Sequence, residues 1–314
     1  MLFRQGGCVM GLTRREFLRI CGGGIAGISL SQMVIPEVVE ALEKAAAGKP
    51  PVLWIQGASC SGCSVSLLNT VHPTIAEVLL KIIDLKFHPT IMAADGEMAI
   101  DALEKTASEN KGKYVLVVEG AIPTGKGGRY CMVGEKKGKE FSMLEWTTDL
   151  GKDALAVLAF GSCATFGGIQ AAKPNPTGAV GVKKLFDMKK IKTPVINVPG
   201  CPSHPDWMVG TIAHILLYGI PKLDYLNRPK VFFDKLLHDH CPYRSFYDDE
   251  VFCKEFPDKE GCRYSLGCKG PETCCDAWKR RWNGGVNWCV QNAICIGCVE
   301  PNFWDEFTPL YESI

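Results

Sequence analysis

The stretch PVLWIQGASCSGCSVS, residues 51–66, decides the fold class because it joins an apolar run directly to two cysteines and a helical pattern. The run 51–57 is short, apolar and closed by a glycine, which is typical of a buried strand. Cys60 and Cys63 follow at once, and from about Ser64 onward apolar residues recur at helical spacing. A buried strand that leads through a loop into a helix indicates an α/β unit.

Three more segments repeat this strand pattern, at residues 114–120, 154–161 and 193–200. Each is aliphatic or β-branched and stops at a glycine. Helical stretches alternate with these runs between about residues 51 and 220. We therefore expect a parallel sheet covered by helices.

The composition changes after about residue 228, where cysteine, glycine, proline and aromatic residues replace the aliphatic runs. Such a segment cannot build a conventional core and needs disulfides or metal to hold it. We place a boundary near residues 224–229. The predicted parts are a signal peptide (1–47), an α/β domain (48–226) and a smaller, irregular or helical domain (227–314).

The N-terminus carries the twin arginine of a Tat-type signal, in TRREFL at residues 13–18. The apolar stretch 20–30 is shorter than the about 20 residues that cross a bilayer. Residues 45–47, all alanine, offer a cleavage site, and Met10 is a candidate start. We expect export of the folded chain to the periplasm, with no membrane span after the signal is removed.

Charge and cysteine content narrow the function classes further. The formal net charge of +1 creates no field that would draw the 314-residue chain to nucleic acid, and the short basic run KRRW (279–282) fits a solvated helix face. Sixteen cysteines need an explanation as disulfides, metal ligands or reactive thiols. Export usually favours disulfides, but the Tat route carries folded proteins and so favours metal clusters assembled beforehand.

Four cysteines stand at predicted strand ends. Cys60 and Cys63 follow the first strand, Cys163 the third and Cys201 the fourth. Loops at the carboxyl ends of parallel strands converge, so these thiols are expected to meet, beside a helix N-terminus that stabilises thiolates. Four thiolates suit an iron–sulfur cluster, which we favour, or structural zinc, and a disulfide stays open. His204, between prolines, is expected to orient a loop.

Two more ligand sets lie in the second half. One consists of a histidine with three cysteines and suits zinc or a histidine-ligated cluster, with His240 as a competitor for the histidine position: His238, Cys241, Cys262 and Cys268. The other combines one of the vicinal pair Cys274 and Cys275 with Cys289, Cys295 and Cys298. Vicinal cysteines cannot easily bind the same ion, so one of the pair is expected to ligate. Cys131 and Cys253 are left as packing residues or free thiols.

Several motifs, taken in order from residue 13 to the end, resemble the small, electron-transfer subunit of NiFe hydrogenases. Besides the Tat signal they are CSGCS, EGAIPTGKGGRYC, GSCATFGGIQAAKPNP, NVPGCPSHPDWMVG, HDHCP, LGCKGP and CIGCVEPNFWD. The segments SVSLLNTVHP, FHPT, RYC and KRRWN are most similar to the NiFeSe branch, whose large subunit carries selenocysteine.

The resemblance implies a flavodoxin-like domain followed by a domain rich in iron–sulfur clusters, with nickel on the partner chain only. It implies a proximal 4Fe–4S cluster on Cys60, Cys63, Cys163 and Cys201. It implies a distal 4Fe–4S cluster on His238, Cys241, Cys262 and Cys268, near the surface with His238 on the solvent side. The medial cluster would use Cys275, Cys295 and Cys298.

The chain departs from the family pattern at the medial cluster. Many members have proline at the position of Cys289 and a 3Fe–4S cluster. A thiolate there favours a medial 4Fe–4S cluster with a lower potential, and 3Fe–4S would apply without Cys289. The family's first medial cysteine falls on Ala277, so Cys275 takes that role, with Cys274 as the fallback. Gly62 and Gly168 occupy the extra positions of six-cysteine proximal sites, which implies an ordinary four-cysteine cluster.

The implied function is electron relay in a heterodimeric hydrogenase. Electrons from hydrogen oxidation at the large subunit would pass through the three clusters to a periplasmic multihaem c-type cytochrome. The alternatives are a cluster subunit of another redox complex, such as respiratory complex I, and a structural zinc protein.

Overall fold

The computed structural model describes residues 50–256, 260–286 and 288–312. The predicted signal peptide therefore lies outside the described residues. Within these ranges no helix is both long and apolar enough to cross a membrane.

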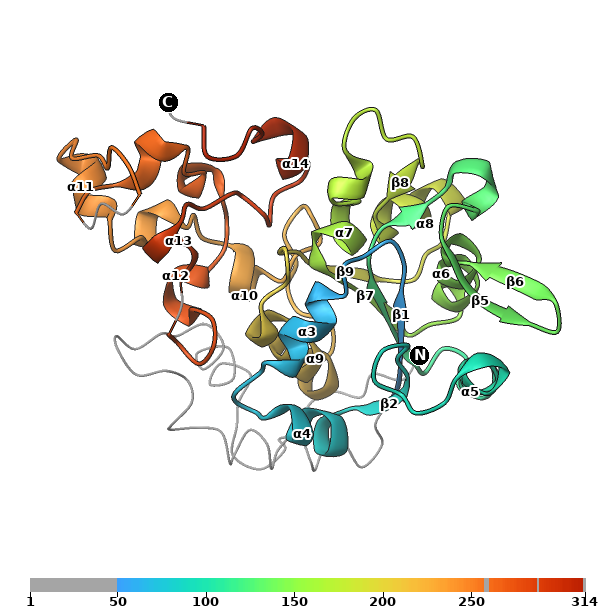
Figure 1. Cartoon of the computed structure of the whole chain (residues 1–314). Helices are drawn as coiled ribbons and strands as arrows, with labels where there is room; N and C mark the ends of the chain where they lie inside the picture. Colours follow the sequence, from blue (N-terminus) through green and yellow to red (C-terminus); the bar gives the residue numbers. More distant parts are fainter. Residues whose placement is uncertain (1–49, 257–259, 287, 313–314) are drawn as a thin grey trace.

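A five-stranded parallel sheet forms the centre of the first half (Figure 1). Its strand order is β2-β1-β3-β7-β9, which is the flavodoxin-like order 2-1-3-4-5. All four predicted strands are confirmed, each slightly shorter than expected, and sequence reasoning missed the edge strand β2. The bounds are β1 (Pro51–Gln56), β2 (Asp84–Phe87), β3 (Val115–Glu119), β7 (Ala156–Phe160) and β9 (Val195–Val198).

Both faces of this sheet are buried, because alternate residues of each strand enter different cores. Val52 and Trp54 of β1 face one core, while Leu53 and Ile55 face the other. The helices on the first face are α3 (Gly62–Leu68) and α9 (Pro205–Tyr218). The second face is covered by α5 (Gly96–Glu109), α6 (Met143–Lys152) and α8 (Val182–Lys189).

The segment between β1 and β2 is not one helix, although its apolar residues follow helical spacing. α3 ends at Leu68, and α4 (Ile75–Glu77) begins anew and runs into the π-helical turn η2 (Val78–Ile82). Pro73 interrupts the segment because proline cannot donate the backbone hydrogen bond that a continuous helix needs. Thr74 and Glu77 then form a capping box that starts α4.

Smaller elements surround the sheet. β4 (Ile122–Pro123) pairs antiparallel with β8 (Ala179–Val180), and β5 (Met132–Lys136) forms a hairpin with β6 (Lys139–Ser142). The short turns between them are η3 (Gly125–Gly128), α7 (Gly161–Phe166) and η4 (Ile169–Ala171).

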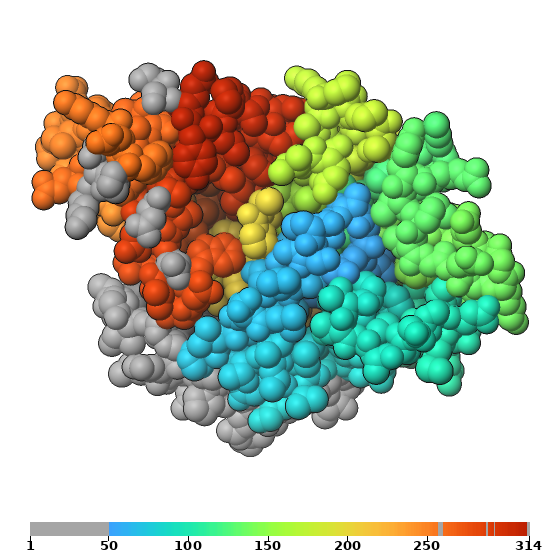
Figure 2. Space-filling model, in the orientation of Figure 1, coloured from blue at the N-terminus to red at the C-terminus, as the bar shows by residue number. Residues whose placement is uncertain are grey.

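The described part of the second half contains short helices, drawn from orange to red in Figures 1 and 2, where it packs against the sheet region. Its described residues form no separate core. Phe232, Trp288 and Val299 belong to the same core as Val52 and Trp207 of the first half. The helices are α10 (Lys230–Phe233), η5 (His238–His240), α11 (Arg244–Asp248), η6 (Arg263–Leu266), η7 (Gly270–Glu272), α12 (Ala277–Arg280), α13 (Cys289–Asn292) and α14 (Phe303–Glu306).

Candidate electron-transfer site

The carboxyl ends of β1, β7 and β9 bring four thiols together, as the strand order predicts. Cys60 precedes α3, Cys63 lies inside it, Cys163 lies in α7, and Cys201 follows β9. Cys60 and Cys201 are exposed, whereas Cys63 is buried. Burial raises the pKa of the Cys63 thiol well above its ordinary value, and the neighbouring Glu119, Cys163 and Cys201 add to the rise. Burial likewise raises the pKa of Cys163 to about 11, with Cys201 and Cys60 among its neighbours.

Gly161 is required where β7 turns into α7. Its φ is +84°, and a side-chain carbon placed there would lie 2.4 Å from the Cys63 sulfur. Any larger residue would therefore push into the space beside that thiol.

Glu119, at the carboxyl end of β3, is a buried carboxylate that sequence reasoning missed. The backbone amides of Cys63 and Ser64 donate to its Oε1 at 3.0 and 3.2 Å. Trp54 Nε1 and Gln56 Nε2 donate to Oε2 at 3.0 and 2.9 Å. The available signal was an acidic residue at the end of an otherwise apolar strand, on the same sheet edge as the cysteines. Glu119 fixes the start of α3 and so the position of Cys63.

A second set of thiols gathers around η5 and η6. Burial raises the pKa of Cys241 to about 11, and Cys268 and Cys262 are its thiol neighbours. Gly270 places His238 beside Cys268, since a carbon added to it would lie 3.6 Å from Cys268 Sγ and 4.0 Å from His238 Cβ. The three cysteines and the predicted histidine therefore lie together.

The His238 ring is buried, with only 6% of the residue exposed. Its expected position on the solvent side of the distal cluster stays a prediction. The edge of the His238 ring meets Tyr247, 4.5 Å away between centroids, and this packing covers it. Its Nε2 is buried without a hydrogen-bond partner, which suits a metal ligand. His240 instead stacks on Trp278 at 4.9 Å.

The third set lies between the other two. Cys275 and Cys295 are buried, burial raises both pKa values well above the ordinary value, and each has Cys298 as a neighbour. Burial raises the pKa of Cys298 to about 12. Cys274 faces away from this set, toward Glu300, Arg228 and Asp224. The structure thus distinguishes the vicinal cysteines, of which the sequence prediction preferred Cys275 and kept Cys274 as the fallback.

The three sets of thiols form one line, because residues of neighbouring sets are in contact. Cys298 has both Cys201 and Cys289 as neighbours, and Ser162 Oγ donates to the Cys298 carbonyl. The Cys295 amide lies 3.3 Å from the Cys268 sulfur, to which it donates. Cys289 has Cys268 and Cys241 among its neighbours, so it stands between the third set and the second.

The other residues that the sequence singles out make packing or hydrogen-bond contacts. Cys131 is half-buried beside the second core, and the buried Cys253 thiol donates to the Gly261 carbonyl at 3.2 Å. No disulfide joins the described cysteines. His204 Nδ1 accepts from the Asp206 amide at 3.1 Å and caps α9, as a loop-orienting residue should.

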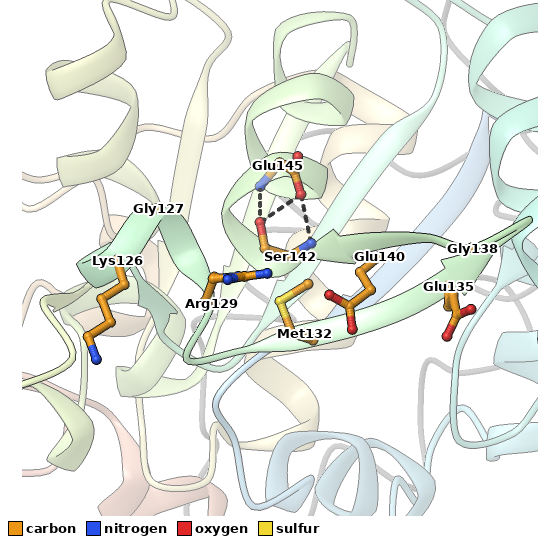
Figure 3. Close-up of a pocket in the computed structure, with 9 residues that line it drawn as sticks. All are labelled: Lys126, Gly127, Arg129, Met132, Glu135, Gly138, Glu140, Ser142 and Glu145. Atoms are coloured by element: carbon orange, nitrogen blue, oxygen red, sulfur yellow. Dashed lines mark hydrogen bonds between the residues drawn. The ribbon is translucent and has the colours of Figure 1, made fainter.

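A surface pocket of about 550 Å³ lies away from these thiols, between η3 and the β5–β6 hairpin (Figure 3). Lys126, Arg129, Glu135, Glu140 and the capping pair Ser142 and Glu145 are among its lining residues. It contains charged side chains of both signs and none of the predicted ligands.

Among the described residues, no three His, Cys, Asp or Glu side chains stand close enough to surround a single metal ion. Iron–sulfur ligands bind separate irons of one cluster, so they stand farther apart than the ligands of one ion. This absence therefore applies to sites for a single metal ion.

A flavodoxin-like sheet with a line of thiols from its edge into a cysteine-rich half is typical of an electron-transfer subunit. The family of the NADH ubiquinone oxidoreductase 20 kDa subunit matches residues 60–215, and the C-terminal family of NiFe/NiFeSe hydrogenase small subunits matches residues 233–311.

Full-length relatives define the family more closely. The chain is 50% identical over 314 residues to the periplasmic NiFeSe hydrogenase small subunit of Desulfomicrobium baculatum, covering 96% of this chain and 99% of that protein. It is 40% identical over 308 residues to the periplasmic NiFe hydrogenase small subunit of Solidesulfovibrio fructosivorans, with 96% and 94% covered. The oxidised NiFeSe hydrogenase of Desulfovibrio vulgaris Hildenborough matches with a TM-score of 0.82 and 51% identity, over 86% of this chain and 99% of that one.

The chain therefore belongs to the small subunits of NiFe/NiFeSe hydrogenases. It is the electron-transfer subunit of a heterodimeric enzyme whose catalytic site is on the large subunit. The two family matches also imply that it carries iron–sulfur clusters.

Proposed function

We propose that the chain relays electrons from hydrogen oxidation through three iron–sulfur clusters. The proximal 4Fe–4S cluster is held by Cys60, Cys63, Cys163 and Cys201. The medial cluster is 4Fe–4S on Cys275, Cys289, Cys295 and Cys298, and the distal 4Fe–4S cluster is held by His238, Cys241, Cys262 and Cys268. The observation that carries this proposal is the unbroken line of thiols from the edge of the sheet to η5.

The surroundings of these thiols favour bound clusters. Burial raises the thiol pKa at Cys63, Cys275 and Cys295 well above its ordinary value, so thiolates there need compensating positive charge. Cluster irons supply that charge, and each cluster when bound accepts and gives up one electron at a time. The chain's own part is to fix the thiolates and to exclude water around them.

The electron acceptor is a basic, multihaem c-type cytochrome that docks beside the distal set. Four exposed acidic residues lie on or directly after η5 and α11, and Arg244 pairs with the first two of them: Asp239, Asp248, Asp249 and Glu250. A surface of this charge attracts and orients a partner rich in lysine. The large subunit covers the opposite end, where Cys60 and Cys201 are exposed.

We place the complex in the periplasm, as the relatives from Desulfomicrobium baculatum and Solidesulfovibrio fructosivorans are named. The Tat route delivers it folded, after removal of residues 1–47. The α/β domain then spans 48–226 and the cluster domain 227–314. Nickel stays on the partner, since each set on this chain is used by a cluster.

Electron paramagnetic resonance on the anaerobic heterodimer tests this function. We expect a silent oxidised state that gains cluster signals under hydrogen. Clusters that respond to dithionite but not to hydrogen would contradict hydrogenase function. Zinc in place of iron and acid-labile sulfide would favour the structural zinc protein instead.

Cys289→Pro is expected to convert the medial cluster to 3Fe–4S and to produce a strong three-iron signal in the oxidised state. The fourth iron loses its thiolate, and the loss of an anionic ligand raises the potential. Proline fits the backbone because residue 289 is the first of α13. The matched control is Cys253→Ser, which should leave the oxidised state silent. A three-iron signal already present in the wild type would refute the role given to Cys289.

A further inference from the structure

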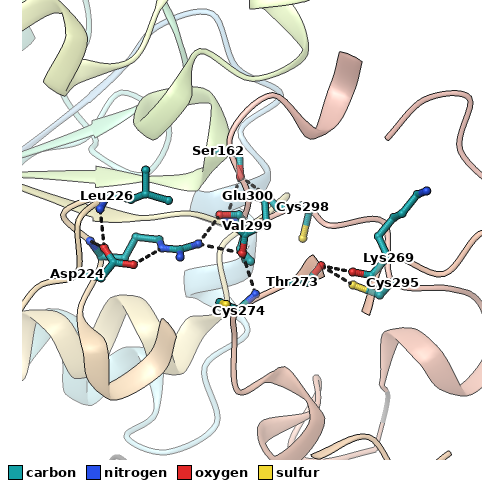
Figure 4. A network of polar contacts seen from close by, with 12 residues as sticks. Ser162, Asp224, Leu226, Lys269, Thr273, Cys274, Cys295, Cys298, Val299 and Glu300 are labelled. Atoms are coloured by element: carbon teal, nitrogen blue, oxygen red, sulfur yellow. Dashed lines mark hydrogen bonds and ion pairs between the residues drawn. The ribbon is translucent and has the colours of Figure 1, made fainter. Parts of the chain in front are cut away.

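A buried arginine, Arg228, joins the two halves of the chain. Figure 4 shows its partners Asp224, Val299 and Glu300 beside Cys274 and Cys298. Arg228 is 2% exposed. Its Nε donates to Asp224 Oδ2 at 2.8 Å, and its Nη1 donates to Glu300 Oε1 at 3.1 Å and to the Val299 carbonyl at 3.0 Å. Asp224 is held in turn by the backbone amides of Leu226 and Arg228, at 2.9 and 2.8 Å.

The same network reaches both chain segments that carry medial ligands. Glu300 follows Cys298 by two residues, and its Oε1 also accepts the Cys274 amide at 2.7 Å. The Cys274 amide immediately precedes Cys275. One guanidinium and one carboxylate therefore fix the loop after Cys298 and the segment of Cys275 against the linker at Asp224.

Only an arginine fits this arrangement. The planar guanidinium presents donors in fixed directions, so one side chain serves Asp224 on one side and Glu300 with Val299 on another. Lysine keeps the charge but has a single terminal nitrogen. Without that fork, the carboxylates of Asp224 and Glu300, 10% and 12% exposed, would lose guanidinium hydrogen bonds that hold them, which destabilises their positions.

We propose that Arg228 is a positioning residue for the medial cluster: acting through Glu300 and the Val299 carbonyl, it holds Cys275 and Cys298 in register. This inference rests on the proposed medial cluster. Arg228 acts through geometry: the reach and direction of its hydrogen bonds matter more than the charges themselves.

Three substitutions separate geometry from charge. Arg228→Lys keeps the charge and loses the fork. Glu300→Asp keeps the charge but shortens the side chain, so one carboxylate oxygen no longer reaches both the Cys274 amide and Arg228. Glu300→Gln removes the charge but keeps the length and an oxygen that accepts both hydrogen bonds.

The readout is a redox titration of the heterodimer followed by electron paramagnetic resonance, which reports each cluster. We expect Arg228→Lys and Glu300→Asp to broaden or abolish the medial signal while the proximal and distal signals persist. Glu300→Gln should keep the medial line shape and shift its reduction equilibrium by less than tenfold, which is 59 mV for a one-electron couple.

The matched control is Arg244→Lys. Arg244 also pairs through Nε with an aspartate four residues away at 2.8 Å, but its side chain is 39% exposed. It should leave the medial signal as in the wild type. If the heterodimer with Arg228→Lys does not assemble, the medial signal of Glu300→Asp tests the positioning role instead.

Two results would overturn the inference. Wild-type medial signals in both Arg228→Lys and Glu300→Asp would show that positioning is not required. A change in Glu300→Gln alone would assign the effect to charge. A wild-type heterodimer without hydrogen-reducible clusters would instead refute the proposed function, so the two failures are distinguishable.

Discussion

Replacement of Cys63 by serine is expected to lower hydrogen-dependent dye reduction by at least about 100-fold, since even losing a partner of a metal ligand costs about 10–100-fold. Cys63 is the buried member of the first set, and its amide is fixed by Glu119. A serine hydroxyl in this buried place would have to ionise to replace the thiolate, and burial opposes that more strongly than for a thiol. The proximal cluster should then be lost or converted.

The measurement is the rate of benzyl viologen reduction by the purified heterodimer, together with its iron content. Cys131→Ser is the control, because Cys131 packs on the second core away from the ligand sets. Isotope exchange between hydrogen gas and deuterated water, catalysed by the large subunit, requires no electron to leave the enzyme. This activity should therefore survive in Cys63→Ser. A Cys63→Ser enzyme with wild-type dye reduction would remove Cys63 from the relay.

The sequence predicts the sheet and the meeting of thiols at its edge because both depend on local signals. Apolar runs closed by glycine mark β1, β3, β7 and β9, and burial on both faces makes these runs unambiguous. Parallel pairing then brings the loops with Cys63, Cys163 and Cys201 to one edge without further information.

What the sequence does not reveal depends on tertiary contacts. β2 lies at the sheet edge, where only Phe87 of its four residues is buried and its pattern is weak. The role of Glu119 depends on donors from β1 and α3, and that of Glu300 on Arg228 and Cys274. The burial of His238 depends on Tyr247 of α11. None of these partners is adjacent in the chain.

The vicinal cysteines show how such contacts decide a ligand. Both have the spacing to complete the third set, so the sequence alone leaves Cys274 as a fallback. In the fold, the Cys275 thiol is buried beside Cys295 and Cys298, whereas the thiol of the half-buried Cys274 faces Glu300 and Arg228. Asp276, which follows, accepts from Trp207 Nε1 at 2.7 Å and from Arg280 Nε at 2.8 Å, and this holds Cys275 inward.

Cys275→Ser is therefore expected to lose the medial cluster and at least about 100-fold in hydrogen-dependent dye reduction, because the middle step of the relay is broken. Cys274→Ser is the matched substitution one residue away, and it should keep the iron content and the medial signal. Iron analysis, dye reduction and the redox titration, run on both variants, check this. The reverse pattern, with Cys274→Ser losing the cluster, would mean that the segment turns over when the cluster binds and that the fallback is the ligand. Loss in both variants would mean that the pair acts through the packing of the segment, since only one of two vicinal thiols is expected to ligate.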